Sequence, residues 1–529
     1  MKEKVTFFKL VAFLAFLVLL LRLFQLQIIE TKKHQGLSEG NRIRKIKVFG
    51  PRGIIFDRHG EILARNLPVF KIKEGEKEKV ISREEALKLQ AEGNDENLYI
   101  DFSRDYPQAE IFSHLVGFLG EVEEKEVAQY GLGAKIGQMG MEQFYNQVLR
   151  GKDGGELVEV NAQGKILRKI GIEEAVPGQD LTLAAEADLQ RMAAREMLGK
   201  KGAVVATKPS TGEVLVLFSS PSFDPNFFGT RRSEETIQKL ISDSVNRPLL
   251  NRAISGIYPP GSTFKIVTAT AGLEEGKITQ NTLINDPGVI YVGAYKYSNW
   301  YFTGYGRTEG EINVIRAIKR STDTFFYKVG ELLGVDKLDQ WARKFGLDKV
   351  YDLDLGGEVA GFVPSAEWKL KNKGESWFLG NTYHFAIGQG DLALTPLGVN
   401  MMSSVIANQG KLCRPQILKL NNDNQIFPCR DLGINRKTIE IVKEGMIGAC
   451  STGGTAYPFF NFLPQVACKT GTAEYVDQEG KTQTHAWFTV FAPAEAPQIV
   501  LTVLVEGGGE GSSVAAPIAR EILGEYFKQ

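Results

Sequence analysis

The feature that most constrains this 529-residue chain is one apolar segment at its start. Phe, Leu, Val and Ile dominate residues 5–29, and Lys9 and Arg22 flank an uninterrupted apolar run at 10–21. That run alone is too short to cross a bilayer, but basic side chains at its ends extend to the interface, so the whole segment can span with some tilt. We predict that residues 1–30 form a cytoplasmic tail and a transmembrane anchor, with the folded bulk on one side of the membrane.

A cleaved signal peptide is the alternative interpretation of this segment. Against it, no small-x-small cleavage site follows the apolar run, and residues 23–27 continue as Leu-Phe-Gln-Leu-Gln. An uncleaved anchor is therefore favoured. Charge leaves its orientation open, because basic residues lie on both sides of the run: Lys2, Lys4 and Lys9 before it, and Lys32, Lys33, Arg42 and Arg44 after it.

The remaining chain has the composition of globular protein, and its length predicts roughly two to four folded units. Lys+Arg and Asp+Glu both number 63, which gives no basic face for a nucleic-acid partner. The four cysteines match no zinc-site spacing. They fit either up to two disulfides, whose pairing the sequence does not define, or small buried thiols: Cys413, Cys429, Cys450 and Cys468.

Strand patterns lie at both ends of the C-terminal part of the chain, with helical patterns between them. Residues 203–217 predict a hairpin of two apolar strands around a Pro/Ser/Gly turn, and 486–491 and 499–505 predict two more buried strands. A final helix is predicted over 515–527. This order predicts one α+β domain whose two ends meet in a single sheet.

The stretch between the anchor and this domain is less strongly patterned. We predict a polar, helix-compatible connector at 31–49, a short strand at 54–56, helix and loop over 73–110, a helix at 141–150, and strands at 156–160 and 180–184.

The first candidate motif is Ser262-Thr263-Phe264-Lys265, the only S-x-x-K in the chain. A Tyr-Pro-Pro-Gly sequence precedes it, and because Pro-Pro-Gly cannot lie inside a helix, a helix is predicted to start at about Ser262. Residues three apart share a helix face, so the Ser262 hydroxyl and the Lys265 amine come within hydrogen-bonding range. Burial on this apolar helix favours the neutral amine, which can take the serine proton. The alternative is an N-capping serine followed by a surface lysine.

The second candidate is Lys469-Thr470-Gly471, the only K-T-G, with Thr472 directly after it. Apolar residues 466–468 precede it and predict a strand, on which Lys469 and Gly471 share one face. There Gly471 lets a substrate backbone approach closely, and Lys469 holds a carboxylate or influences Lys265. The alternative is a glycine-containing hairpin.

An S-x-D or S-x-N pattern occurs at Ser222, Ser244 and Ser321. Only Ser321, with Asp323 two residues later, lies between the other two motifs, and it opens an amphipathic run. The first two serines are predicted to be turn residues.

S-x-x-K, S-x-N and K-T-G in this order are the signature of penicillin-binding proteins and serine β-lactamases, and the chain resembles them. Resemblance to class B penicillin-binding proteins covers nearly the whole chain and thins at about residues 73–110. The sequence Ser-Thr-Asp-Thr-Phe-Phe-Tyr at 321–327 most resembles the elongation type, penicillin-binding protein 2. Further matching segments are Arg52-Gly53-Ile54-Ile55-Phe56-Asp57-Arg58, Gly388-Gln389-Gly390-Asp391 and His485-Ala486-Trp487-Phe488.

The resemblance implies a membrane-anchored protein with an extracytoplasmic catalytic part. Residues 31–180 would form an elongated pedestal of the dimerisation type, and 181–529 an α+β transpeptidase domain with an antiparallel sheet and helices. The short 73–110 region implies a reduced head of the pedestal. A membrane glycan polymerase of the shape, elongation, division and sporulation class is the implied protein partner, beside the cytoplasmic membrane itself.

The resemblance also implies a D,D-transpeptidase that cross-links peptidoglycan stem peptides ending in D-Ala-D-Ala, during elongation and shape maintenance. β-Lactams would acylate the same serine. The implied roles are Ser262 as nucleophile, Lys265 as its base, Ser321 as proton relay, the N–H groups of Ser262 and Thr472 as oxyanion hole, and Lys469 with Thr470 or Thr472 as carboxylate site.

Two departures from the family pattern concern the second motif. Asp323 stands where most members have Asn, and because the elongation type often has Asp, we interpret this as a subtype feature. Some members bind a metal through a Cys near this motif, but no Cys lies near Ser321, so no metal or cofactor is predicted.

Three alternatives for the activity stay open at this point. A β-lactamase or a D,D-carboxypeptidase would share the first step with water as acceptor, but a β-lactamase needs no pedestal. For a non-catalytic scaffold or β-lactam sensor, the intact motifs argue against an inactive enzyme but do not exclude sensing. The five histidines are dispersed along the chain, which disfavours a Ser-His-Asp triad.

Overall fold

The computed structural model describes two compact units. The described residues are 2–32, 43–74, 77–94, 98–131, 133–161, 166–229, 231–420, 428–477 and 479–528. The first unit comprises Met1–Gly53, Pro68–Phe102 and Gln147–Gln179, and the second comprises Ile54–Leu67, Ser103–Asn146 and Asp180–Gln529.

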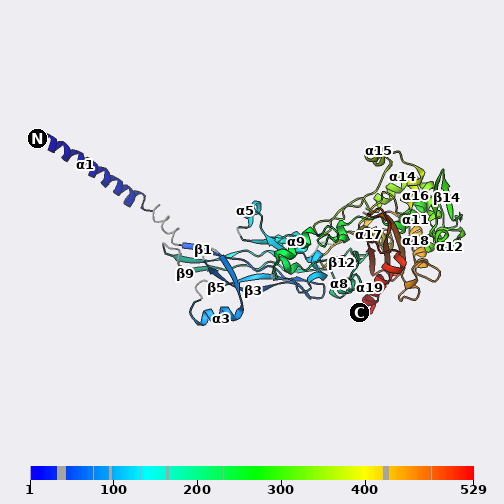
Figure 1. Cartoon of the computed structure of the whole chain (residues 1–529), viewed down its shortest axis with the longest axis horizontal. Coiled ribbons are helices and arrows are strands. Elements are labelled where there is room, and N and C mark those ends of the chain that lie inside the picture. Colours follow the sequence, from blue (N-terminus) through cyan, green and yellow to red (C-terminus); the bar gives the residue numbers. More distant parts are fainter. Residues whose placement is uncertain are drawn as a thin grey trace. The chain divides into compact units, whose positions relative to one another are not determined.

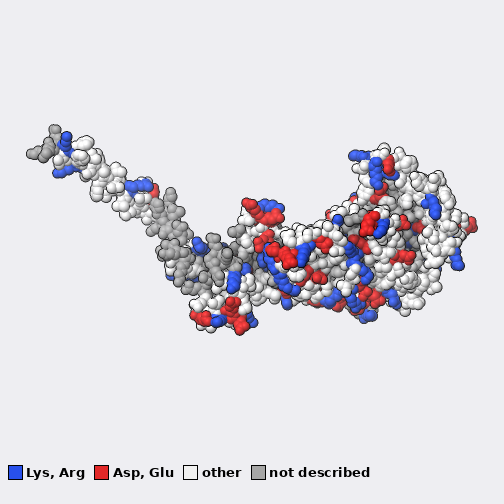
Figure 2. Space-filling view, in the orientation of Figure 1, with Lys and Arg blue, Asp and Glu red and all other residues white. Residues whose placement is uncertain are grey.

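The N-terminal segment forms one long helix, α1 (Lys2–Phe24), which continues as a π-helical turn, η1 (Gln25–Ile29) (Figure 1). Its large apolar side chains are exposed; Phe8, for example, keeps 72% of its surface accessible. Lys4–Ile29 is long and apolar enough to cross a membrane, and basic residues flank an uncharged middle, as Figure 2 shows. The expected membrane-length helix is therefore present.

The first unit contains strands that the sequence patterns did not predict. β1 (Ile43–Val48) pairs antiparallel with β8 (Gly154–Val160), which pairs with β9 (Ile166–Glu173). The connector prediction is thus wrong for 43–48, and its residues 33–42 lie outside the described part. Because Val48 pairs with Gly154, a hundred residues away in sequence, the local pattern carries little signal of this pairing.

The charged region 73–110 is also richer in strands than predicted. It contains β4 (Lys77–Ile81), α3 (Arg83–Ala91) and β5 (Leu98–Asp105). The helix follows the local sequence, since the Ser82 hydroxyl caps it by accepting the N–H of Glu85 at 3.1 Å. The predicted helix at 141–150 is divided into α6 (Gly140–Phe144) and α7 (Asn146–Leu149).

In the second unit, the segment that carries Asp57 and Arg58 supports the start of a helix. β2 (Ile55–Phe56) pairs with β10 (Leu181–Thr182) in parallel, which brings Asp57 beside α8 (Ala187–Glu196). The buried Asp57 carboxylate accepts the N–H of Ala187 at 3.2 Å and so acts as an N-cap from outside the helix. Arg58 pairs with Glu186 at 2.9 Å.

The centre of this unit is a five-stranded antiparallel sheet, in the order β12-β11-β21-β20-β19. The strands are β11 (Gly202–Thr207), β12 (Val214–Ser220), β19 (Ala467–Val476), β20 (Thr482–Ala492) and β21 (Ile499–Val505). The predicted meeting of the two ends of the domain in one sheet, and the α+β class, are confirmed.

Helices cover both faces of this sheet (Figure 1). On one face, alternate strand residues such as Val204 and Leu501 pack with α8 and the C-terminal helix α19 (Ala516–Lys528) in the main apolar core. On the other face lies α17 (Pro396–Ala407), where the buried Asn400 amide donates to strand carbonyl oxygens at 3.1 and 3.0 Å. Buried strands on both faces explain their near-continuous apolar sequences.

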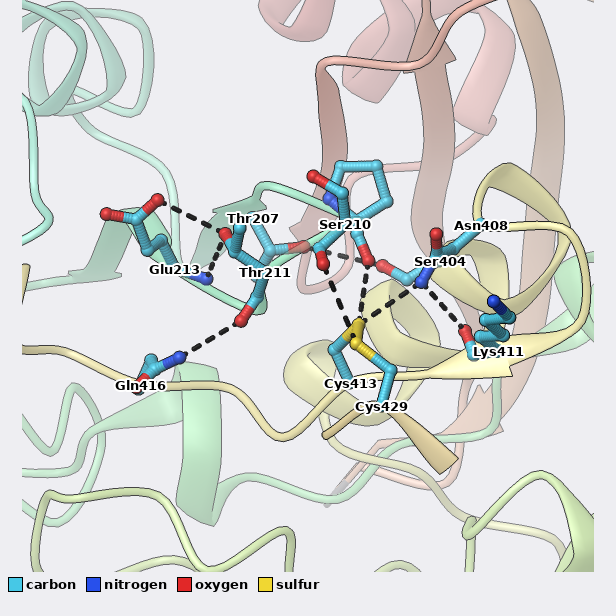
Figure 3. Close-up of a disulfide and its surroundings, with 11 residues drawn as sticks. Thr207, Ser210, Thr211, Glu213, Ser404, Asn408, Lys411, Cys413, Gln416 and Cys429 are labelled. Atoms are coloured by element: carbon cyan, nitrogen blue, oxygen red, sulfur yellow. Dashed lines mark hydrogen bonds between the residues drawn. A yellow bond between two sulfur atoms is a disulfide. The ribbon is translucent and has the colours of Figure 1, made fainter. Parts of the chain in front are cut away.

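Two disulfides join the four cysteines: Cys413–Cys429, drawn in Figure 3, and Cys450–Cys468. Of the two possibilities that the sequence left open, the structure therefore has disulfides rather than thiols.

We expect removal of residues 1–30 to convert a membrane-bound protein into a soluble one, because α1 is the one membrane-length helix among the described residues. Full-length and truncated chains would be compared by membrane fractionation and alkaline extraction. Retention of the truncated chain in the extracted membrane would contradict the anchor assignment.

Candidate active site

Ser262 lies in a short 3-10 turn, η5 (Gly261–Phe264), which leads directly into α11 (Lys265–Glu274). Gly261 has a φ of +55°, and its N–H donates to the carbonyl of Gly388 at 2.8 Å. A Cβ at Gly261 would lie 3.0 Å from the carbonyl oxygen of Thr472, so glycine suits this position for both reasons. The α-helix was predicted to begin at about Ser262, but it begins at Lys265, because residues 261–264 form a tighter 3-10 turn that contains the serine.

The segment before Ser262 is tied to the central sheet. Trp487 on β20 is fully buried, and its indole N–H donates to the carbonyl oxygen of Pro259 at 2.9 Å. The Tyr258 hydroxyl donates to the Glu506 carboxylate at 2.6 Å. Trp487 belongs to a segment that the family resemblance singled out, whereas no sequence motif pointed to Glu506.

The Lys265 side chain is completely buried and points to the second motif. Its Nζ donates to the Asp323 carboxylate at 2.7 Å, to the Ser321 carbonyl oxygen at 2.8 Å and to Ser321 Oγ at 3.3 Å. Among the described residues, no hydrogen bond joins Ser262 Oγ to this amine, in contrast to the expectation from their spacing. Catalytic hydrogen bonds are often long before substrate binds, so the arrangement keeps Lys265 as a candidate base.

Burial lowers the pKa of Lys265 below its ordinary value of 10.5, because the ammonium loses its water, and the Asp323 carboxylate opposes this shift. A neutral amine keeps two N–H groups, enough for Asp323 and for the carbonyl of Ser321. Its lone pair is then free to accept a hydroxyl proton. The lowered pKa and the free lone pair therefore make Lys265 a candidate base, a role that the proposed reaction below uses.

Ser321 occupies the junction between α13 (Val314–Arg320) and α14 (Asp323–Lys344). Its φ of +53° is rare for a residue with a side chain, and such strain is often kept at functional sites. This conformation ends α13 and turns the chain so that both the carbonyl and the hydroxyl of Ser321 meet Lys265.

Lys469 approaches the same hydroxyl from β19. Its Nζ donates to Ser321 Oγ at 2.8 Å and to the carbonyl oxygen of Thr470 at 3.0 Å, and the side chain is fully buried. Burial first, and the neighbouring Lys265 second, lower the pKa of Lys469 well below 10.5, with Asp323 acting against them. One serine hydroxyl thus connects two buried amines, as a proton relay requires.

β19 is an edge strand of the central sheet, and the outer side of this edge faces the Ser262 turn. In antiparallel pairs, the N–H and C=O of one residue point to the same side. The Thr472 carbonyl accepts the Gln389 amide at 3.4 Å, away from β20, so the Thr472 N–H also points outward. An edge strand of this kind can bind an extended peptide by backbone hydrogen bonds.

Gly471 has a different neighbour from the one that the sequence suggested. A Cβ at Gly471 would lie 3.0 Å from the Pro260 carbonyl oxygen, from Thr263 Cγ2 and from Trp487 Cβ. The glycine therefore lets the chain's own Ser262 turn pack closely against β19. We correct the expectation that its missing Cβ directly admits substrate backbone.

Two residues that no motif indicated hold Asp323 in place. The Asn299 side-chain oxygen accepts the N–H of Asp323 at 3.2 Å, and the Trp300 N–H donates to the Asp323 carboxylate at 3.1 Å. Asn299 is fully buried, and its amide donates to Asp286 at 2.8 Å. Asp286 also accepts the Thr324 hydroxyl at 2.7 Å, which completes a buried network behind the second motif.

Comparisons with known proteins assign this fold and site to a family. The model of the penicillin-binding protein transpeptidase domain matches residues 202–524, more than half of the chain, and the model of the penicillin-binding protein dimerisation domain matches 75–183. The peptidoglycan D,D-transpeptidase MrdA of Haemophilus influenzae is 33% identical over 603 residues, covering 98% of this chain and 91% of that protein.

Two solved structures are similar over nearly the whole chain. One is the complex between penicillin-binding protein 2 and MreC from Helicobacter pylori, with a TM-score of 0.82 and 29% identity over 92% of this chain and 99% of that one. The other is a peptidoglycan synthase complex that coordinates polymerization and crosslinking, with a TM-score of 0.78 and 31% identity over 99% and 98%. The chain belongs to the penicillin-binding protein transpeptidase family, and the class predicted from its three motifs is confirmed.

We expect Asn299→Ala to reduce the maximal rate of acylation by a penicillin about tenfold or more, because small displacements of a catalytic group are costly. Asn285→Ala, at an exposed asparagine that directly precedes Asp286 on β13 (Ile284–Asp286), is the matched control. Rapid-quench labelling with a fluorescent penicillin measures both rates. Equal rates would contradict the positioning role of Asn299.

We expect Asp323→Asn to move the pH dependence of acylation to lower pH. In its expected role as base, Lys265 must be neutral, so the rate is expected to rise with pH through its pKa. Burial lowers the pKa of Lys265 and the Asp323 carboxylate raises it, so removing that carboxylate makes the pKa fall further. The measurement is the second-order labelling rate from acidic to mildly alkaline pH. The exposed Asp336→Asn, beyond the kink at Gly334 in α14, is the control. A shift to higher pH would contradict the prediction.

Proposed function

We propose that this protein is a peptidoglycan D,D-transpeptidase of the elongation type, acting through an acyl-serine intermediate on Ser262. The observation that supports this most strongly is the convergence of Lys265 and Lys469 on the Ser321 hydroxyl, behind the turn that carries Ser262. The names of the relatives support peptidoglycan as the substrate class, and the contacts of the two lysines with Ser321 support acid–base catalysis at Ser262.

The proposed reaction begins with attack of Ser262 Oγ on the carbonyl of the penultimate D-Ala. The hydroxyl proton passes to Lys265, and the C–N bond to the terminal D-Ala breaks. Ser321 delivers a proton to the leaving nitrogen and is reprotonated from the lysines that contact it. An amine of a neighbouring stem peptide then attacks the ester, which forms the cross-link and restores the Ser262 hydroxyl.

The N–H groups of Ser262 and Thr472 are the proposed oxyanion hole. The outward direction of the Thr472 backbone and its closeness to Gly261 support this assignment. Each such donor lowers the free energy of the transition state by about 3 kcal/mol. Lys469, with Thr470 or Thr472, is proposed to bind the terminal carboxylate of the stem peptide. The Thr470 hydroxyl is held in place by the Thr455 hydroxyl, 2.9 Å away.

We further propose that α1 is a single-pass anchor in the cytoplasmic membrane and that the catalytic part lies outside the cytoplasm. The wall substrate requires this side. The two disulfides support it independently, because structural disulfides persist in oxidising, extracytoplasmic compartments.

For the domains, we propose the tail and anchor at 1–30, a pedestal at 31–180 and the transpeptidase domain at 181–529. The match of the dimerisation-domain model to 75–183 supports the second boundary. The proposed partners are the stem peptide, β-lactams, the cytoplasmic membrane and a membrane glycan polymerase, the last supported by likeness to a complex that couples polymerization to crosslinking.

Covalent labelling with a fluorescent penicillin tests this function. We expect an adduct on the wild type, confirmed by intact mass, that is lost in Ser262→Ala and retained in Ser222→Ala, the matched serine of another S-x-D pattern. An adduct that lasts for hours is expected of a transpeptidase, whereas one lasting seconds would indicate a β-lactamase. Failure of well-folded wild type to react would overturn the Ser262 assignment and favour a scaffold.

A further inference from the structure

The two disulfides close loops of nearly equal length but lie in different surroundings. Their cysteines are separated by 16 and 18 residues, respectively, so in a chain-entropy model both constrain the unfolded chain to the same degree. Any difference between their effects on catalysis must therefore come from where they lie.

Cys450–Cys468 joins the strand of the third motif to a helix end. Cys468 directly precedes Lys469 on β19 and is fully buried, and Cys450 is the C-cap of α18 (Arg436–Ala449). Because Cys468 is the neighbour of Lys469 in the chain, the bond fixes the backbone from which the Lys469 side chain reaches Ser321 Oγ.

The loop that this disulfide closes also contacts the second motif. The carbonyl of Thr452 accepts the Lys319 ammonium at 3.0 Å, and the carbonyl of Gly453 accepts the Arg320 guanidinium at 3.1 Å. Lys319 and Arg320 form the last turn of α13, immediately before Ser321. A third contact, between the hydroxyls of Thr455 and Thr470, returns the loop to the K-T-G strand.

The other disulfide has no comparable neighbours. Cys413 Sγ lies 3.1 Å from the Pro209 carbonyl oxygen, and Asn408 donates to it at 3.1 Å, at the β11–β12 turn and the end of α17 (Figure 3). Within the described residues, none of its hydrogen-bonding neighbours bonds to a side chain of the three motifs.

We propose that Cys450–Cys468 is a positioning disulfide of the active site, which couples the second and third motifs and makes acylation depend on its oxidation. This proposal rests on the function proposed above for Ser262. The bond forms when the two thiols pass two electrons and two protons to a disulfide of an extracytoplasmic thiol–disulfide oxidoreductase, which becomes a dithiol; a small dithiol reverses it.

The test compares two double variants, C450A/C468A and C413A/C429A. Both should lose similar thermal stability, since the closed loops match. At a temperature well below both melting points, the maximal rate of acylation by a fluorescent penicillin should fall at least tenfold in C450A/C468A and stay within twofold of wild type in C413A/C429A. Equal rates in the two variants would overturn the proposal.

A redox titration keeps the test decisive if C450A/C468A does not fold. In the C413A/C429A background, Cys450–Cys468 is the one disulfide left, so dithiothreitol acts on it alone. Free thiols counted by alkylation and mass spectrometry should rise as the acylation rate falls, and reoxidation should restore the rate. A rate that falls only together with near-ultraviolet circular dichroism would indicate a role in folding and overturn the positioning role.

The same experiment separates this proposal from the proposed function. If neither wild type nor C413A/C429A forms an adduct, the acyl-serine function is wrong. If both form one and C450A/C468A reacts equally fast, the function holds and the positioning role of the disulfide is wrong.

Discussion

The structure depends on the burial of two lysine amines around one serine hydroxyl. Lys265 and Lys469 are both fully buried and both contact Ser321 Oγ, while Asp323 is the carboxylate bonded to Lys265. Two ammonium groups without water and with one carboxylate would be a costly arrangement, so burial drives the lysines toward the neutral form. That tendency suits Lys265 to the role of base that we propose for it.

Such a site requires a rigid surrounding, because a buried polar atom that lacks a hydrogen-bond partner is costly in free energy. Several polar residues outside the three motifs meet this need: Asn299 and Asp286 fix Asp323, and Trp487 fixes the carbonyl before the Ser262 turn. β19 and β20 are neighbouring strands of the central sheet, so the third motif and the tryptophan are held in one hydrogen-bonded frame. Helices α13 and α14 bring the second motif to it.

The sequence predicted the parts of the molecule whose signals are local or ordered along the chain. The three motifs, the hairpin at 203–217 and the C-terminal strands are continuous patterns, and they predicted the α+β sheet and the site residues together. The prediction of a connector at 43–48 was wrong, because these residues become a strand by pairing with a segment that is distant in sequence, near residue 154. Asn299 and Asp286 were missed because a single buried amide or carboxylate has no sequence pattern. The sequence predicted a close backbone approach at Gly471, but the neighbour is the chain's own Ser262 turn and not a substrate.

The choice of Asp at position 323 can be understood from the charge changes of the proposed reaction. A carboxylate beside Lys265 makes the neutral base harder to form, since it favours the ammonium. The same carboxylate stabilises the ammonium that appears when Lys265 takes the Ser262 proton. A base is most effective when its pKa lies near the working pH, so burial and Asp323, acting in opposite directions, adjust one property from two sides. An asparagine has one acceptor oxygen for the two hydrogen bonds that the Asp323 carboxylate accepts, from Lys265 and from the Trp300 backbone N–H. It also gives up the charge, which leaves burial to set the pKa of the base alone.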